Sequence, residues 1–457
     1  MNDTIAAIAT ALAPSAIGIL RLSGPESVAV LDRVFTPAHG GPMSGRPDHT
    51  LVYGTLTDPE GQAIDYCLAT VSRAPHSYTG EDTAELQCHG SPAALVLGLE
   101  ALFAAGARQA QAGEFPRGAF LAGKLALPRT EPIADPIHAE SPAAVRQAAG
   151  QLGGALARVI EETYQSLTDL MAHFHAVLDY PDEDIEPFQA AEISSTLAAA
   201  AAKLDRLAGS YRRGRALMEG VPCAIIGRPN AGKSTLFNAL LGYDRAIVTP
   251  IAGTTRDTVE ERLNLGGVLL RLIDTAGLRD ADDQVEQLGV ERSRAAVEQA
   301  ELVLVVLDGS RNLTQEDRDA LDLGLSAPRC AVILNKDDLP GQEGPQLPKL
   351  PPQVPVVRLS ALTGEGVDQL ELAMENLFPD DSGMRPGALL TNARQVQAAQ
   401  QARQAVSQAA QALQNGMPPD AVLSDVEQAL AALGELTGRV VREDVTARIF
   451  ERFCVGK

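Results

Sequence analysis

The chain has 457 residues, of which 45% are hydrophobic and 21% charged, and this composition excludes a disordered chain. The length favours two or three domains over one. A formal net charge of −21 argues against tight nonspecific binding to nucleic acid, because neutralising phosphates requires many Lys and Arg side chains on one face. An RNA substrate would therefore need a local basic patch or a partner protein to hold it.

The cysteines and the first residues predict a cytoplasmic protein without a membrane partner. The five cysteines lie far apart with no C-x-x-C pair, which indicates neither a zinc site nor a disulfide framework and fits a reducing compartment. The first stretch, MNDTIAAIATALAP, has an acidic residue where a signal peptide carries positive charge. No apolar run approaches the length that spans a membrane.

The pattern of the first part of the chain, residues 17–90, predicts β-strands. Short apolar runs are separated by Gly, Pro and Asp clusters that are typical of turns. These runs cover residues 17–24, 51–56, 66–72 and 84–90. We predict an N-terminal α+β domain over residues 1–120.

Helical spacing dominates the segments on both sides of a later, strand-rich region. Apolar residues recur at helical spacing from Val145 to Val177, which predicts one helix of about 30 residues, and again from Leu197 to Tyr211. After the breaker stretch PDDSGMRPG the same spacing runs from Leu389 to Leu413 and from Val422 to Leu433. We predict a helical domain in two parts, residues 121–216 and 380–457.

Between these parts, buried-strand runs alternate with helical segments. The runs CAIIG, VLLRLID, LVLVVLD, CAVILN and VVRLS all fall between residues 221 and 378. This alternation predicts a doubly wound parallel sheet over residues 217–379. The predicted fold class is a multidomain α/β protein: an N-terminal α+β domain and a helical domain into which a doubly wound P-loop GTPase domain is inserted.

The first of these strands runs into the phosphate-binding motif G-x-x-x-x-G-K-S at residues 227–234. Glycines let backbone N–H groups turn toward the phosphates, Lys233 neutralises the β/γ oxygens, and the Ser234 hydroxyl reaches Mg²⁺. The residues expected to bind the nucleotide here are Asn230, Ala231, Gly232, Lys233, Ser234 and Thr235.

Three further motifs follow strand ends in the order that specifies GTP. In the first, a carboxylate approaches Mg²⁺ through water and a glycine N–H lies near the γ-phosphate. In the second, Asp338 accepts from the guanine N1–H and exocyclic amine, a pairing that adenine cannot make, while Lys336 covers the ring. The third supplies a backbone donor to the guanine oxygen. The expected binding residues are Asp274, Thr275, Ala276 and Gly277; Asn335, Lys336 and Asp338; and Ser360, Ala361 and Leu362.

The segment at the switch I position supplies a further Mg²⁺ ligand and several carbonyls. Thr255 is placed to close on Mg²⁺, and the free carbonyls could line a cation site. Position 278 is leucine where a Ras-type GTPase has its water-orienting glutamine, so another group must orient the water. The binding residues expected in this segment are Thr249, Pro250, Ile251, Ala252, Gly253, Thr254 and Thr255.

With these motifs in place, the whole chain resembles the MnmE (TrmE) family of bacterial tRNA-modification GTPases. The resemblance is carried by DTIAAIAT, IGILRLSG, SYTGEDTAELQCHG, GEFPRGAFLAGKL, LDYPDEDI, TPIAGTTRD, DTAGLR and RIFERFCVGK, besides the P-loop. Era- and Der-like ribosome-assembly GTPases share the GTP motifs alone, whereas the first domain and the ending FCVGK are far more specific.

The resemblance implies a homodimer formed through the N-terminal domain, with a pocket in each copy for 5-formyltetrahydrofolate or a related reduced folate. It implies that the chain works with the flavoprotein MnmG, in a heterotetramer, on the wobble uridine of certain tRNAs. The product would carry a carboxymethylaminomethyl-type group at C5, with a folate one-carbon unit entering the new bond.

Site residues also follow from the resemblance, position by position. The folate contacts would be Arg21, Glu85, Lys124 and Lys457, and Cys454 would be a catalytic thiol. Potassium would be ligated by Asn230, Thr249, Ile251 and Thr254. Glu286 would activate the attacking water.

One stretch departs from the family pattern. Gly118 and Ala122 stand where the family usually has Arg and Asn. Pro128, Pro132 and Pro136 interrupt a segment that is normally helical, and an interior proline costs about 3 kcal/mol. Either the helix begins only after Pro136, or the folate and hinge region is remodelled, which makes the role of Lys124 less secure than that of Arg21.

Two functions therefore compete. The first is a tRNA-modification enzyme in which GTP hydrolysis drives a conformational cycle. The second is a regulatory GTPase of ribosome assembly with no chemistry beyond GTP hydrolysis. A basic RNA-binding module after the G domain would favour the second, whereas this chain has an acidic helical tail ending in FCVGK, which favours the first.

Overall fold

The computed structural model describes residues 3–124, 127–133, 135–179, 190–243, 261–273, 294–339, 345–379 and 384–437. These residues fall into two compact units, one built mainly from residues before 135 and the other mainly from residues 135–429. The predicted boundaries at 120/121, 216/217 and 379/380 remain predictions, because this division of the chain does not follow them. Within the described helices, none is long and apolar enough to cross a membrane.

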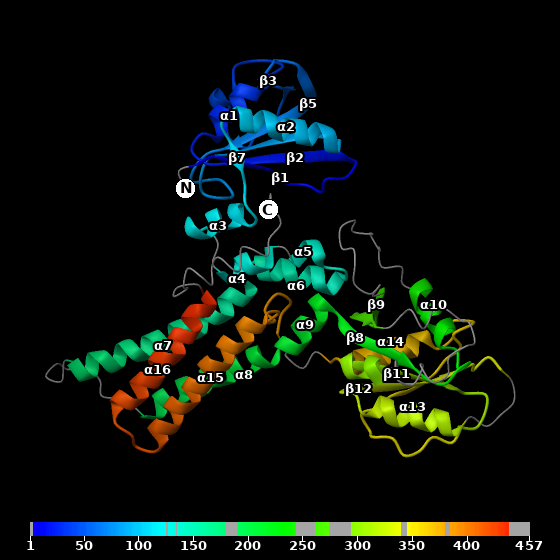
Figure 1. The fold of residues 1–457 in the computed structure, drawn as a ribbon. Helices are drawn as coiled ribbons and strands as arrows, with labels where there is room; N and C mark the ends of the chain where they lie inside the picture. The colour runs from blue at the N-terminus through cyan, green and yellow to red at the C-terminus, as the bar shows by residue number, and fades with distance from the viewer. Residues whose placement is uncertain are drawn as a thin grey trace. The chain divides into compact units, whose positions relative to one another are not determined.

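The first unit is a seven-stranded sheet in the order β3-β4-β5-β6-β2-β1-β7, antiparallel except where β1 meets β7 (Figure 1). The strands are β1 (Ile5–Ile8), β2 (Ser15–Ser23), β3 (Phe35–Pro37), β4 (Val52–Thr57), β5 (Ala63–Ser72), β6 (Thr83–Gly90) and β7 (Arg108–Gln109). The helical elements are α1 (Ser27–Val34), the short η1 (Met43–Gly45), α2 (Pro92–Ala104) and α3 (Glu114–Leu121). The predicted strands at 17–24, 51–56, 66–72 and 84–90 are confirmed as β2, β4, β5 and β6.

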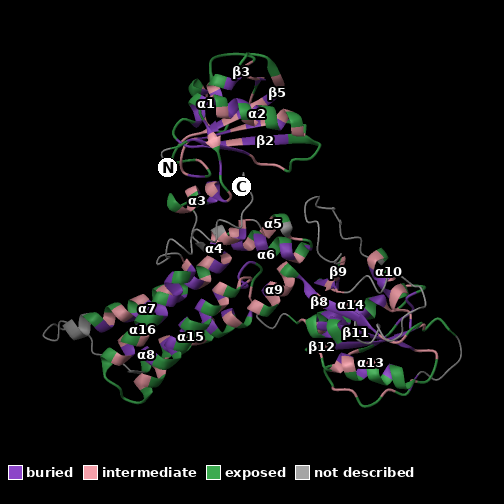
Figure 2. Cartoon of the chain, viewed as in Figure 1, coloured by how far each residue is buried: buried purple, intermediate pink, exposed green. Residues whose placement is uncertain are grey.

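Alternation along the strands separates a buried face from an open one (Figure 2). On β6, Ala84, Leu86 and Cys88 are buried in a core with α1 and α2, while Glu85 and Gln87 between them are partly exposed. Successive side chains of a strand point to opposite faces, so α1 and α2 cover one face of the sheet. On the other face Phe115 of α3 packs against Ile5 and Ala7 of β1, while the side chains of β4, β5 and β6 are partly or largely exposed, and we call this the open face.

The three prolines that interrupt the family's helix each occupy the second residue of a short helical element. These elements are α4 (Leu127–Thr130), η2 (Glu131–Ile133) and α5 (Asp135–His138). A proline is tolerated in a first turn because its missing N–H would have no helical partner there. The first longer helix of this stretch, α6, begins only after Pro136, as one of the two alternatives predicted.

The longer helices before and after the inserted segment differ from the sequence prediction at two points: the stretch predicted from Leu197 to Tyr211 is divided at Ser210 between two helices, and the stretch predicted before it is divided as well. These helices are α6 (Pro142–Leu152), α7 (Ala155–Asp179), α8 (Ala190–Gly209), α9 (Tyr211–Glu219), α15 (Ala393–Gln414) and α16 (Pro419–Thr437). The single helix predicted from Val145 to Val177 is wrong, because Gly153 caps α6 and Gly154 adopts a φ of +80° before α7 begins. A Gly-Gly pair stops a helix where apolar spacing alone continues it.

The segments before and after the inserted sheet pack against each other in the second unit. Helices α8 and α15 lie side by side (Figure 1), with an Asp205–Arg403 ion pair of 2.6 Å between them. The side-chain amides of Gln147 and Gln151 both donate to the Leu389 carbonyl, at 3.0 and 2.8 Å. The α/β segment is therefore an insertion in a helical domain, as predicted.

The inserted segment forms a six-stranded sheet in the order β13-β12-β11-β8-β10-β9. Its strands are β8 (Val221–Ile226), β9 (Glu261–Leu265), β10 (Val268–Leu272), β11 (Leu302–Asp308), β12 (Arg329–Asn335) and β13 (Val356–Arg358). The helices around it are α10 (Lys233–Tyr243), α13 (Gln315–Leu325) and α14 (Val367–Leu377), which contribute to two separate core clusters, one on each face. The doubly wound sheet is confirmed.

The prediction of a wholly parallel sheet needs a correction at one edge. Strand β9 pairs antiparallel with β10 through a tight turn at Gly266 and Gly267, both with positive φ. The two-residue Gly-Gly connection between apolar runs is the signal in the sequence for this hairpin.

Candidate functional site

The P-loop joins β8 to α10 and is shaped by two glycines that no other residue could replace without strain. Gly232 has φ +96°, and a Cβ there would lie 2.1 Å from Nδ2 of Asn335. At Gly227, φ is +150° and a Cβ would lie 2.3 Å from the Val306 carbonyl. Asn230, between them, has a φ of +60°, a conformation that asparagine tolerates better than most side chains. The loop is thus fixed in a turn that directs backbone groups inward.

Lys233 begins α10 and points back into this loop. Its ammonium donates to the carbonyls of Gly227 at 2.8 Å and Arg228 at 2.9 Å. Burial, with a smaller contribution from the nearby Arg228 charge, lowers the pKa of Lys233. Ser234 and Thr235 follow in the first turn of the helix, where free N–H groups and the helix dipole favour an anion. A phosphate group bound at this end of the helix would place a negative charge beside the partly buried Lys233 ammonium.

Asn335 joins three of the predicted motifs. Its side-chain amide donates to the Ala231 carbonyl at 3.0 Å, and its side-chain oxygen accepts from the Ala361 N–H at 2.9 Å. The residue is 2% exposed. One buried side chain thereby holds the P-loop together with the two guanine motifs, residues 335–338 and 360–362, which lie more than 100 residues further along the chain.

The guanine motifs form an open edge beside this junction. The Ser360 hydroxyl donates to Asp338 at 2.6 Å and orients its carboxylate, while Leu362 is exposed. Lys336 has a φ of +70°, and its ammonium donates to the Asn230 carbonyl at 2.8 Å, so its aliphatic chain extends from the N-K-D-D loop to the P-loop. The structure thus links Lys336 to the P-loop and Asp338 to Ser360.

An ion network centred on the buried Asp308 lies beneath the site and was not predicted from the sequence. Asp308, at the end of β11, accepts from Lys336 at 2.9 Å and lies within 3.4 Å of Arg228 and 2.7 Å of Arg311. Burial alone would raise the pKa of the Asp308 carboxyl, but hydrogen bonds from Ser310, Lys336 and Arg311 outweigh it and hold the pKa below its usual range. An acid that ends a buried strand in LVLVVLDGS was the available signal.

The same ion network fixes the position of the Arg228 side chain. Its Nε lies 3.0 Å from Oδ1 of Asp317, so that this guanidinium faces two carboxylates that are each 2% exposed. The Arg228 guanidinium is therefore held by Asp308 and Asp317.

Several predicted site residues lie outside the described residues. They are Thr249, Pro250, Ile251, Ala252, Gly253, Thr254 and Thr255, then Asp274, Thr275, Ala276 and Gly277, and also Leu278, Glu286, Cys454 and Lys457. Of the predicted potassium ligands only Asn230 is described, and of the two direct magnesium ligands only Ser234. Over the part of the chain that is described, no group of three or more His, Cys, Asp or Glu residues could hold a metal ion.

A second cluster lies on the open face of the first unit. Arg21 and Glu85 are paired across β2 and β6, with 2.8 Å between Nε and Oε1. The Arg21 guanidinium carbon lies 5.6 Å from the ring centroid of Tyr78 and 5.9 Å from that of Phe115. Burial raises the pKa of Tyr78, although the Arg21 charge opposes this shift. The two aromatic rings were not singled out from the sequence.

Lys124 lies beside the loop that carries Tyr78. A Cβ at Gly80 would contact Cγ of Lys124 at 3.6 Å and Cβ of Ala122 at 2.7 Å. Gly80 has a φ of +82°, so the loop turns tightly beneath the lysine chain. The structure thus brings Arg21 and Glu85 into contact and places Lys124 against the loop that carries Tyr78.

The described P-loop, the guanine motifs tied together by Asn335, and the doubly wound sheet define a P-loop GTPase. Residues 4–124 match the family model described as GTP-binding protein TrmE N-terminus, and residues 127–454 match the model of the MnmE helical domain. The chain belongs to the MnmE (TrmE) family.

Relatives in this family are similar over their whole length. A protein of Symbiobacterium thermophilum named tRNA modification GTPase MnmE is 44% identical over 458 residues, with 100% of both chains covered. A Chloroflexus aurantiacus protein of the same name is 42% identical, again over 100% of both chains. Era, solved with MgGDPNP and nucleotides of 16S ribosomal RNA, is 25% identical over 40% of this chain and 66% of its own, with a TM-score of 0.26.

Proposed function

We propose that the chain is a tRNA-modifying GTPase that acts with MnmG to install a carboxymethylaminomethyl-type group at C5 of the wobble uridine. The observation that carries this proposal is the end-to-end similarity to relatives named tRNA modification GTPase MnmE. A ribosome-assembly GTPase remains the second candidate, on the GTP motifs alone. It is the weaker one, because the likeness to Era covers only 40% of the chain.

GTP hydrolysis is assigned to the inserted domain. Ser234, Thr255 and, through water, Asp274 would hold Mg²⁺, while Asn230 and the carbonyls of Thr249, Ile251 and Thr254 would hold K⁺. When bound, these ions would supply positive charge at the β/γ bridge, where negative charge develops.

Water activation requires a residue other than position 278, which is leucine. Glu286 would accept a proton from the attacking water, directly or through a second water. Arg228 is committed to Asp308 and Asp317, which leaves the γ-phosphate to Lys233 and the cations. Contact between two G domains would order the switch I segment and offset the entropic cost of closing it.

The Arg21 cluster fits a reduced folate. Folate presents a carboxylate tail and a pterin ring with an amide edge, so a guanidinium, a carboxylate and aromatic faces complement it. In this site Arg21 and Glu85 supply the two charges, Tyr78 and Phe115 the rings, and Lys124 a further cation, with Lys457 completing the set. Folate would provide the one-carbon unit, and the thiol of Cys454 would act near the transferred group.

The open face of the sheet favours a homodimer. Ile17, Tyr53 and Tyr66 are 56–59% exposed on β2, β4 and β5, on the face opposite α1 and α2. A cluster of exposed apolar side chains of this kind is typical of an interaction surface. A second copy covering it would enclose Arg21 and Glu85, which lie on the same face, and the assembly with MnmG would be built on this dimer.

The decisive experiment is nucleoside analysis of bulk tRNA. A strain that lacks the gene should lose the modified wobble uridine and regain it when the chain is expressed. Unchanged tRNA nucleosides together with a defect in ribosome subunit profiles would replace the first candidate with the second.

A further inference from the structure

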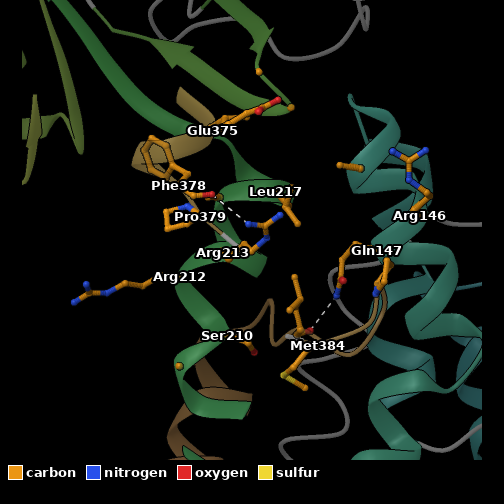
Figure 3. A pocket seen from close by; sticks show the side chains of 18 of the residues that line it. Arg146, Gln147, Ser210, Arg212, Arg213, Leu217, Glu375, Phe378, Pro379 and Met384 are labelled. Atoms are coloured by element: carbon orange, nitrogen blue, oxygen red, sulfur yellow. Dashed lines mark hydrogen bonds between the residues drawn. The ribbon is translucent and has the colours of Figure 1, made fainter. Parts of the chain in front are cut away.

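A cavity of about 750 Å³ lies in the second unit, and no residue of the P-loop or of the two guanine motifs lines it (Figure 3). It is lined by α6, by the junction of α8 and α9, by the β9–β10 turn, and by the segment that follows α14. Gln147 donates to the Leu389 carbonyl at one side and Arg213 donates to the Phe378 carbonyl at the other, at 3.0 and 3.2 Å. These bonds fix the walls of the cavity.

The charge of the cavity is opposite to that of the chain. Its described lining includes five guanidinium groups and two carboxylates, a local excess of three positive charges in a chain of net charge −21. The charged lining residues are Arg146, Arg206, Arg212, Arg213 and Arg329, with Glu301 and Glu375. Glu301 is bracketed by Arg329 at 3.0 Å and by Arg215 at 2.9 Å, so its charge is offset within the wall.

The remaining guanidinium groups face solvent or the cavity. Arg146, Arg206 and Arg212 are exposed, and they come from three different helices. Figure 3 shows Arg146 on α6 across the cavity from Arg213, while the Arg212 side chain extends from α9 away from Arg146. Arginine binds phosphate through two parallel N–H···O bonds, which makes it the side chain best suited to a nucleic-acid backbone.

We propose that this arginine-lined cavity and its rim bind the phosphate backbone of tRNA. The proposal rests on the proposed function, which requires an RNA substrate for a chain whose overall charge repels it. The cavity supplies the local basic patch that such a chain needs. Exposed arginines on three helices suit a chain of several phosphates better than one small anion.

The test compares two double variants with equal changes in net charge. Arg146→Gln with Arg212→Gln removes two exposed cavity guanidiniums, and Arg158→Gln with Arg318→Gln removes two exposed arginines that do not line it. Filter binding of bulk tRNA to the full chain is measured over a range of KCl concentrations. The cavity variant should bind about tenfold more weakly, and its slope of log affinity against log salt should fall by about 1.5, since each phosphate contact contributes about 0.7–0.9.

The control variant should match the wild type in both quantities, and all three proteins should hydrolyse GTP at the same rate. Equal affinity and slope for the two double variants, or wild-type chain that binds no tRNA at low salt, would overturn the proposal. Inorganic tripolyphosphate distinguishes the two possible ligands of the cavity. If the wild type binds tripolyphosphate and the cavity variant does not, while the cavity variant still binds tRNA normally, the cavity is an anion site that is not used for RNA.

Failure of the proposed function gives a different result. If the wild-type chain does not restore the wobble modification in the deletion strain, the function is wrong regardless of the cavity. If it restores the modification and the cavity variant does so equally at low expression, only the cavity proposal fails.

Discussion

In the nucleotide site the contacts run between buried groups of the chain itself, whereas in the Arg21 cluster they lie on the open face of a sheet. Asn335 is 2% exposed and bonds to two other loops, and Asp308 gathers three cations beneath them. Arg21 and Glu85 form one cross-strand ion pair with side chains 25% and 28% exposed. Part of the nucleotide site is thus held by contacts within the chain itself, while the Arg21 cluster would exclude water only beneath a ligand or a second copy.

This difference predicts where substitutions matter. A buried network leaves groups unsatisfied when one member is removed, so its losses are large and affect stability as well as binding. A partly exposed pair gains little stability from its own attraction, so its loss should appear in ligand binding alone.

The largest effect is expected for Gly232→Ala. Its Cβ would meet the Asn335 amide at 2.1 Å while φ is +96°. The clash and the strain together should cost about 4 kcal/mol, or about a thousandfold in GTP affinity, measured by nucleotide titration. Gly61→Ala is the control, since φ there is +81° but nothing lies within 4 Å. If Gly232→Ala binds GTP as tightly as the wild type, the P-loop is not rigid.

Asp308→Asn tests the ion network centred on Asp308 beneath the P-loop. Leaving Arg228, Arg311 and Lys336 without this carboxylate should destabilise the domain by about 3 kcal/mol at neutral pH, measured by urea denaturation. The folded-state pKa of Asp308 is lowered, so its contribution is present above the usual carboxyl pKa and is lost as pH falls through the folded value.

The difference between Asp308→Asn and wild type should therefore shrink on acidification. Asp322→Asn, at an exposed position of α13, should show no such difference at any pH. A constant gap across the acid range would assign the loss to packing and not to charge.

Hydrolysis itself should depend on Glu286 and on potassium. Glu286→Ala should lower phosphate release by about 100-fold, the scale of a positioned general base, with GTP affinity retained. For the wild type, hydrolysis should be faster in KCl than in NaCl at matched ionic strength and should rise with protein concentration. Glu298→Ala, exposed and near in sequence, is the control. Equal rates in the two salts would remove the potassium site from the proposal.

On the open face, Arg21→Ala should weaken binding of 5-formyltetrahydrofolate by about tenfold, since a charge-assisted contact with a carboxylate is lost. Calorimetry should show this loss with GTP affinity and thermal stability unchanged. Arg33→Ala removes an exposed arginine of the same unit that pairs with Glu26 at 3.5 Å, and it should bind folate normally. Equal folate binding by both variants would separate Arg21 from the folate site.

The smallest biochemical change is expected for Cys454→Ser. GTP hydrolysis should be unaltered, because the residue lies more than 90 positions beyond the last GTP motif, while tRNA modification should fall. The comparison is made in the deletion strain by nucleoside analysis, with GTP hydrolysis of the purified variant as the control. Full restoration of the modified uridine by this variant would assign the thiol a packing role.

Local patterns predicted many elements of the fold. The five buried-strand runs of the inserted domain became β8, β10, β11, β12 and β13. The central strand β11 is buried along its whole length and is therefore continuously apolar, whereas β13 at the sheet edge buries only Val357. The prediction failed at two places, in each of which a glycine pair overrode a longer pattern. Gly153–Gly154 ended a helix that apolar spacing continued, and Gly266–Gly267 turned an edge strand antiparallel.

The sequence by itself determined the nucleotide chemistry, since the P-loop and guanine motifs consist of contiguous residues whose spacing already defines the loops that hold phosphate and base. Only the tertiary structure decided what supports them. Asn335 reaches the P-loop, and Asp308 meets Arg228, because parallel strands end at one edge of a sheet. Tyr78 and Phe115 beside Arg21, and the arginines that α6, α8 and α9 bring to one cavity, are likewise distant in sequence. Such groupings depend on packing between elements, which no local pattern encodes.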